Sequence, residues 1–148
     1  MIYIVSVFIF VLDFITKWLA TSYLTTHSAV AVLPIFNFYL TYNSGISFSM
    51  LTAHSEVETA LLIGIALAIC LGIVYMIHQE KSKWMRFALA MILGGASGNV
   101  WDRIRYGAVV DFLDFHWQQY HFPAFNIADS AICLGAGLIL LQMLRRKK

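Results

Sequence analysis

The sequence predicts an all-α membrane protein of four transmembrane helices, with a small extracytoplasmic β-hairpin or cradle and a short interfacial helix or loop. Composition is the first reason, because 60% of the 148 residues are hydrophobic and only 12% are charged, whereas about 25% of a soluble domain is charged. The second reason is that the apolar residues gather into long runs. So little charge cannot cover a surface that faces water, and we therefore expect lipid around most of the chain.

Each predicted transmembrane helix is an apolar run that approaches the ~20 residues needed to cross a hydrocarbon core of about 30 Å. The runs cover residues 2–20, 60–77, 84–100 and 124–144. Charge is absent from the second run, and only Arg86 and Asp129 interrupt the third and fourth. The first run holds Asp13 and Lys17 and lacks the basic start and small-residue cleavage site of a secretory signal peptide, so we expect it to be retained.

Basic residues indicate the orientation of these helices. They cluster around the start of the third run and in the C-terminal tail, as Lys81, Lys83, Arg86, Arg145, Arg146, Lys147 and Lys148. Cytoplasmic segments of membrane proteins carry an excess of Lys and Arg, so we expect both termini in the cytoplasm. Residues 21–59 and 102–123 then lie outside, and residues 1–148 form one membrane domain.

The two outer segments differ in pattern. Residues 36–42 are rich in aromatic residues, residues 43–45 have turn composition, and residues 46–50 alternate apolar and polar side chains. Together these patterns indicate a small β-hairpin. Residues 112–122 are rich in aromatics and histidine, which is typical of an interfacial segment at the level of the lipid headgroups.

Two aspartates could act as a pair at the outer boundary. Asp111 lies just beyond the third run, and Asp129 lies about one and a half turns into the fourth. Two carboxyl groups held close in a low dielectric cannot both ionise, so such a pair can deprotonate a water and protonate a carbonyl oxygen, as in aspartic proteases. The residues alone leave open a pair of separate aspartates, one capping the fourth helix. They also leave open Asp114 in place of Asp111.

Other ionisable and nucleophilic residues offer weaker patterns. Asp13 and Lys17 share one helix face at i, i+4, which predicts an intramembrane ion pair, with contact to a lipid headgroup or support of the site as the alternative. Gly95-Ala96-Ser97-Gly98 matches the Gly-x-Ser-Gly pattern of rhomboid serine proteases, but a serine nucleophile needs a base. We expect these small residues to permit close helix packing instead.

Metal and cofactor chemistry finds no support in the sequence. The five histidines, at positions 27, 54, 78, 116 and 121, all fall in predicted loops, and none has the ligand spacing of a zinc site. Cys70 and Cys133 lie inside apolar runs and are expected to be buried hydrophobes. We therefore expect no metal, no cofactor and no nucleic acid partner.

Five blocks of the sequence resemble, in the same order, those of the lipoprotein signal peptidase family, also called signal peptidase II. They are Asp13-x-x-x-Lys17, Asn43-x-Gly45, Gly94-Gly95-Ala96-x-Gly98-Asn99-x-x-Asp102-Arg103, Val109-Val110-Asp111-Phe112 and Phe125-Asn126-x-Ala128-Asp129. The resemblance spans nearly the whole chain, and the last three blocks together are highly specific. Two departures are Ser47, where the family usually has Ala, and Ser97, at a commonly apolar position; neither touches the aspartates.

This resemblance implies a bacterial inner-membrane aspartic peptidase with four helices, a β-cradle and a short surface helix. Its implied substrates are prolipoproteins with a diacylglyceryl group on a cysteine, cut on the N-terminal side of that cysteine. The implied residue roles are catalytic for Asp111 and Asp129, substrate-binding for Asn43, Gly45, Asn99, Arg103 and Asn126, and supporting for Asp13 and Lys17. We expect a monomer surrounded by membrane lipids, with its active site near the extracytoplasmic face.

Two other functions stay open on the residues alone. Intramembrane acids also serve proton relays, so a small proton-coupled transporter is one alternative, and a lipid-binding subunit without catalysis is another. A transporter predicts acids spread through the depth of the membrane, whereas here most of them lie near the outer face.

Overall fold

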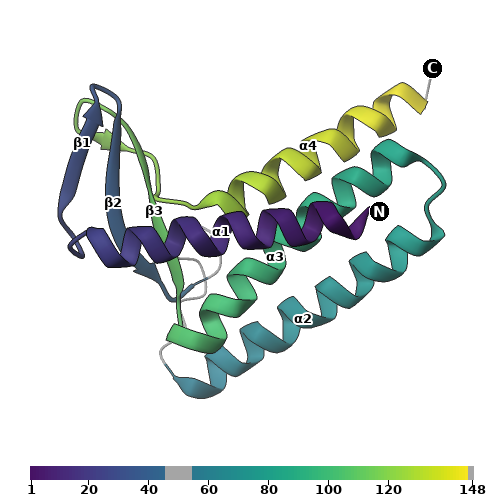
Figure 1. The fold of residues 1–148 in the computed structure, drawn as a ribbon, viewed down its shortest axis with the longest axis horizontal. Coiled ribbons are helices and arrows are strands. Elements are labelled where there is room, and N and C mark those ends of the chain that lie inside the picture. The colour runs from purple at the N-terminus through teal and green to yellow at the C-terminus, as the bar shows by residue number, and fades with distance from the viewer. Residues whose placement is uncertain (46–54, 147–148) are drawn as a thin grey trace.

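The computed structural model describes residues 1–45 and 55–146, and these residues form four long helices and four short strands. The helices are α1 (Tyr3–Tyr23), α2 (Glu56–Gln79), α3 (Lys83–Tyr106) and α4 (Ile127–Arg146). The strands are β1 (Ala29–Leu33), β2 (Phe36–Asn43), β3 (Val109–Trp117) and β4 (Tyr120–His121). The sheet stands at one end of the helices, while the N-terminus and the α2–α3 connection lie at the other end (Figure 1).

Helix α3 is the centre of the helical part, because it packs against α1, α2 and α4. Its glycines permit this. A Cβ atom at Gly94 would lie 2.6 Å from the carbonyl oxygen of Ser6 on α1, and one at Gly95 would collide with the carbonyl oxygen of Ala128 on α4. The prediction that the small residues serve close helix packing is confirmed.

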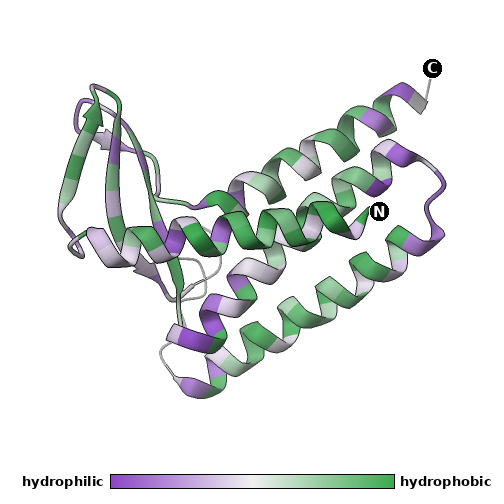
Figure 2. Cartoon of the chain, viewed as in Figure 1, coloured by the Kyte–Doolittle hydropathy of each residue, from purple (hydrophilic) through white to green (hydrophobic). Residues whose placement is uncertain are grey.

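The outward surfaces of the helices are apolar. Large hydrophobic side chains such as Leu67, Leu71, Leu134 and Leu140 are exposed, and hydrophobic residues run along most of α1, α2 and α4 (Figure 2). Within the described residues, α1, α2 and α4 are long and apolar enough to cross a membrane. Helix α3 is less apolar because it holds glycines and charged ends, and its neighbours shield much of its surface.

The strands form one antiparallel sheet in the order β1-β2-β3-β4. The predicted strand at residues 36–42 is confirmed as β2, but it pairs with β1 and β3. The expected partner strand, residues 46–50, lies outside the described residues, as does Ser47. The expectation of an interfacial helix or loop at residues 112–122 is wrong, because most of this segment pairs as β3 and β4. Its aromatic residues are strand formers that stack across the sheet.

Several helix boundaries differ from those predicted, each for a local reason. Helix α2 begins at Glu56 because Ser55 and Glu58 form a reciprocal capping box ahead of the apolar run. Helix α3 extends beyond residue 100 and ends at Gly107, whose φ of 72° suits glycine. Residues 102 and 103 therefore lie on α3 rather than in an outer loop.

The start of α4 matters most for the site. This helix begins at Ile127, later than the expected residue 124, so Asp129 lies in its first turn and not about one and a half turns inside. The C-terminal end of α1 meets the sheet through a buried apolar cluster that includes Ala20, Leu40 and Val110. This cluster anchors β3 against the helices, directly beside Asp111.

Candidate active site

Asp111 lies on β3 and is only 2% exposed. Asn126 donates a hydrogen bond of 2.7 Å from Nδ2 to its Oδ1, and Asn43 donates one of 3.2 Å from Nδ2 to its Oδ2. Burial, and then the negative charge of Asp129, raise the pKa of Asp111 to about 7 in spite of these hydrogen bonds and the positive charge of Lys17. A carboxyl group with this pKa can give or take a proton near neutral pH.

Asp129 lies in the first turn of α4 and is half-buried. Its Oδ1 accepts a hydrogen bond of 2.7 Å from Nδ2 of Asn99, and its Oδ2 accepts one of 3.3 Å from the backbone N–H of Asn126. The N–H of Asp129 donates in turn to Oδ1 of Asn126 at 2.8 Å. This reciprocal pattern resembles a capping box. It places the carboxyl group at the N-terminus of α4, the positive end of the helix dipole.

Asn126 connects the two aspartates. It is fully buried, and its amide turns Nδ2 toward Asp111 and Oδ1 toward the backbone of Asp129. The same Nδ2 also lies 3.2 Å from the carbonyl oxygen of Val110. The Asn126 side chain, at the start of α4, thus links Asp111 on β3 to Asp129 on α4.

A buried ion network lies behind this pair. The predicted ion pair between Asp13 and Lys17 is confirmed, with Nζ at 2.7 Å from Oδ2. Lys17 also pairs with Oδ2 of Asp102 at 2.8 Å and donates to Oδ1 of Asn99 at 2.9 Å. Sequence reasoning assigned no role to Asp102, although a carboxylate within the glycine-rich block was the available signal.

The remaining candidate binding residues join the same network. Arg103 donates from Nη2 to the carbonyl oxygen of Gly45 at 2.7 Å and from Nη1 to that of Asn99 at 3.4 Å. The N–H of Gly45 donates to Oδ1 of Asn43 at 3.0 Å. Arg103 also lines a groove between α2 and α3. All the substrate-binding residues predicted from the resemblance therefore lie within one or two contacts of Asp111 or Asp129.

Asp114 is placed elsewhere. It follows Asp111 by three residues on the same strand, and side chains at odd spacings point to opposite faces of a sheet. Its carboxylate is buried and accepts a hydrogen bond of 2.9 Å from Nδ2 of Asn37, and Nδ1 of His121 lies 2.9 Å from its Oδ1. These partners make Asp114 part of the sheet rather than of the Asp111–Asp129 arrangement.

Ser97 and the histidines were the other candidates for a nucleophile and for metal ligands. Ser97 donates its hydroxyl hydrogen to the carbonyl oxygen of Leu93 in its own helix at 2.8 Å, a common bond for serine inside helices. The expectation that all histidines lie in loops is wrong, because His78 belongs to the last turn of α2, and His116 and His121 lie on paired strands. Among residues 1–45 and 55–146, no three His, Cys, Asp or Glu side chains are grouped to hold a metal ion.

Comparison with known proteins identifies the family of this chain. Residues 5–145 match the family model described as signal peptidase (SPase) II. The lipoprotein signal peptidase of Polynucleobacter necessarius is 44% identical over 143 residues, which cover 96% of this chain and 88% of that protein. The lipoprotein signal peptidase of Haemophilus influenzae is 43% identical over 141 residues, covering 94% of this chain and 82% of that protein.

A solved structure described as a bacterial membrane enzyme has the same fold. It superposes with a TM-score of 0.89 and 28% sequence identity, over 98% of this chain and 88% of that one. The family match and these relatives cover nearly the whole chain, including the blocks that hold Asp111 and Asp129. The chain therefore belongs to the signal peptidase II family of proteases.

Proposed function

We propose that this protein is an intramembrane aspartic endopeptidase that removes signal peptides from bacterial prolipoproteins. Its substrates carry a diacylglyceryl group on a cysteine, and cleavage occurs on the N-terminal side of that cysteine. The observation that best supports this proposal is the position of Asn126, whose one buried amide contacts both Asp111 and Asp129. Such an arrangement places two carboxyl groups of different character around one reaction centre.

The two aspartates divide the proton transfers. Asp129, at the N-terminus of α4 and hydrogen-bonded by Asn99 and Asn126, acts as the carboxylate base. Asp111, whose pKa is raised to about 7 by burial and by Asp129, acts as the acid. Asp129 takes a proton from water as the water oxygen bonds to the scissile carbonyl carbon, and Asp111 gives its proton to the carbonyl oxygen. The C–N bond of the resulting gem-diol then breaks, the leaving nitrogen takes the proton held by Asp129, and a diol hydroxyl returns a proton to Asp111.

The polar residues beside the pair bind the substrate backbone. Arg103 presents a planar fork of donors that now contacts the carbonyl oxygen of Gly45, and a substrate carbonyl or lipid ester oxygen is the same kind of acceptor. Asn43 and Asn99 each use one end of the amide to hold an aspartate. These residues bind the peptide on both sides of the scissile bond, while Asp13 and Lys17 support them from behind.

The shape of the molecule supports a membrane placement. We place four spans across the membrane and count α3 among them although its neighbours shield it, since its 24 residues are more than the ~20 needed. The sheet lies at the end opposite the N-terminus and the α2–α3 connection (Figure 1). With the basic connection and termini in the cytoplasm, the sheet and both aspartates lie at the outer boundary of a bacterial inner membrane, in a monomer surrounded by lipid.

A pair of matched substrates tests this proposal. The purified protein is incubated with one prolipoprotein peptide bearing a diacylglyceryl cysteine and with the same peptide unlipidated, in the same liposomes, and initial rates are measured. Fast cleavage of only the lipidated peptide is expected, because two acyl chains fix the depth of the scissile bond and positioning contributes several kcal/mol. Equal rates would overturn the substrate assignment. Absence of cleavage would favour the transporter or the lipid-binding subunit.

A further inference from the structure

Two backbone N–H groups in the site have matching partners. The N–H of Ala128, the residue before Asp129, donates to Oδ1 of Asp13 at 2.8 Å. The N–H of Val110, the residue before Asp111, donates to Oδ2 of Asp102 at 3.1 Å. Each proposed catalytic aspartate is therefore preceded by a residue whose backbone is held by a buried carboxylate.

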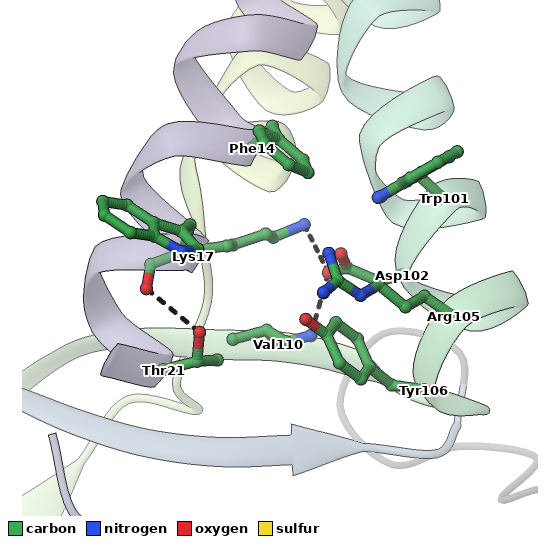
Figure 3. A pocket seen from close by; sticks show the side chains of 9 residues that line it. Phe14, Lys17, Thr21, Trp101, Asp102, Arg105, Tyr106 and Val110 are labelled. Atoms are coloured by element: carbon green, nitrogen blue, oxygen red, sulfur yellow. Dashed lines mark hydrogen bonds and ion pairs between the residues drawn. The ribbon is translucent and has the colours of Figure 1, made fainter. Parts of the chain in front are cut away.

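Lys17 joins these two carboxylates. Its Nζ lies 2.7 Å from Oδ2 of Asp13 and 2.8 Å from Oδ2 of Asp102. Figure 3 shows the Lys17 side chain extending from α1 toward Asp102 on α3, and Asp102 contacting the N–H of Val110 on β3. The path Ala128–Asp13–Lys17–Asp102–Val110 thus spans α4, α1, α3 and β3 without a gap.

The burial of these three charged side chains is costly and needs an explanation. Asp13, Lys17 and Asp102 are only 1%, 4% and 3% exposed, and removing ions from water carries a large free-energy cost. A hydrophobic contact between the same helices would avoid that cost. An apolar side chain, however, cannot accept a hydrogen bond from the N–H of Val110 or Ala128.

We infer that Asp13, Lys17 and Asp102 form a clamp that sets the separation of Asp111 and Asp129 through the backbone at Val110 and Ala128. The inference rests on the proposed roles of the two aspartates. The three clamp residues touch no reacting atom, so they are positioning residues. Lys17 adds a second link by donating to Oδ1 of Asn99, which turns Nδ2 of that amide toward Asp129.

The carboxylates of Asp102 and Asp13 accept their contacts on different sets of oxygens, and this difference can be tested. Asp102 receives both Lys17 and the N–H of Val110 on the single atom Oδ2. Asp13 receives Lys17 on Oδ2 and the N–H of Ala128 on Oδ1. An asparagine side chain has only one oxygen. In Asp102→Asn that oxygen can accept from both Lys17 and the N–H of Val110. In Asp13→Asn the NH₂ group must face either Lys17 or the N–H of Ala128, and both of these are donors.

The experiment compares kcat and KM of Asp13→Asn and Asp102→Asn on the diacylglyceryl-modified peptide. We expect Asp13→Asn to lose about 100-fold in kcat, the loss typical of a misplacement of about 1 Å, and Asp102→Asn to lose less than about 10-fold, with little change in KM. Asp114→Asn is the matched control, since it neutralises a buried aspartate on the other face of β3 and should keep wild-type kcat. Equal kcat for the Asp13 and Asp102 variants would overturn the clamp.

A second comparison applies where Asp13→Asn fails to fold. Asp102→Ala removes both contacts at position 102, and Asp102→Asn restores them, so kcat should fall in the first variant and recover in the second. Equal kcat in these two variants would also overturn the clamp. Failure of the proposed function looks different, because the wild-type protein would then leave the peptide uncut or Asp111→Asn would remain active.

Discussion

The side-chain nitrogen Nδ2 of Asn126 donates a hydrogen bond of 2.7 Å to Oδ1 of Asp111. The oxygen of the same amide accepts the N–H of Asp129 at the start of α4. One residue therefore serves a helix as its cap and a carboxyl group as its hydrogen-bond donor. The two roles depend on different atoms and are separable by mutation.

Asn126→Ser and Asn126→Ala separate these roles. Serine can cap α4 but cannot reach Asp111 with an amide donor, and alanine can do neither. We expect both variants to lose about 10- to 100-fold in cleavage rate, because Asp111 loses the donor that holds it in place and a misplacement of about 1 Å can cost about 100-fold. Only Asn126→Ala should lose a further ~1 kcal/mol in the free energy of unfolding, the usual value of a cap. Initial rates and denaturant unfolding in detergent measure the two effects. Equal stability of the two variants would contradict the capping role.

Asp111→Asn and Asp129→Asn should each abolish cleavage. Either change removes one half of the acid–base pair, which is worth about 100- to 10,000-fold for a single general acid or base. Initial rates on the lipidated peptide measure the loss. Retention of more than a few per cent of activity by either variant would exclude the dyad. Ser97→Ala serves as the control and should cleave normally, because the Ser97 hydroxyl donates to the carbonyl oxygen of Leu93 in its own helix and to neither aspartate.

Cleavage should decline as the pH rises through about 7. Asp111 has its pKa raised to about 7 by burial and by Asp129, so it holds its proton below this pH and loses it above, and as the proposed acid it then has nothing to donate. The hydrogen bond from Asn43 lowers the pKa of Asp111. Asn43→Ala should therefore raise the pH at which kcat declines. A profile of kcat at saturating substrate tests this, and an unchanged pH of decline in the variant would contradict the assignment of Asp111 as the acid.

Reporter fusions test the orientation of the helices. A reporter after Lys148 or inserted near Lys81 should indicate the cytoplasm, and one near Ser55, before α2, should indicate the outside. The reason is the excess of basic residues in the tail and in the α2–α3 connection. An outside signal from the C-terminal tail would invert the topology and move both aspartates to the cytoplasmic boundary.

The amino-acid sequence by itself determined the helices and pointed to the two aspartates. Apolar runs are a local property, so all four predicted segments fall on a helix, although α3 continues to Tyr106, well past the predicted end at residue 100. The ion pair of Asp13 and Lys17 was equally readable, because residues at i, i+4 always share a helix face. The aspartates were identified by the motifs around them and by their place at the ends of apolar runs.

Only the tertiary structure decided how these parts meet. The pairing of β2 with β3 joins segments far apart in the chain, and the N–H of Ala128 finds Asp13 across 115 residues. No local pattern encodes such contacts, because each depends on how closely α1, α3 and α4 approach at the glycines of α3 and α4. For the same reason the sequence offered no more for Asp102 than its place in the glycine-rich block. A carboxylate near a helix end is ordinary until folding places a lysine on one side of it and the backbone before Asp111 on the other.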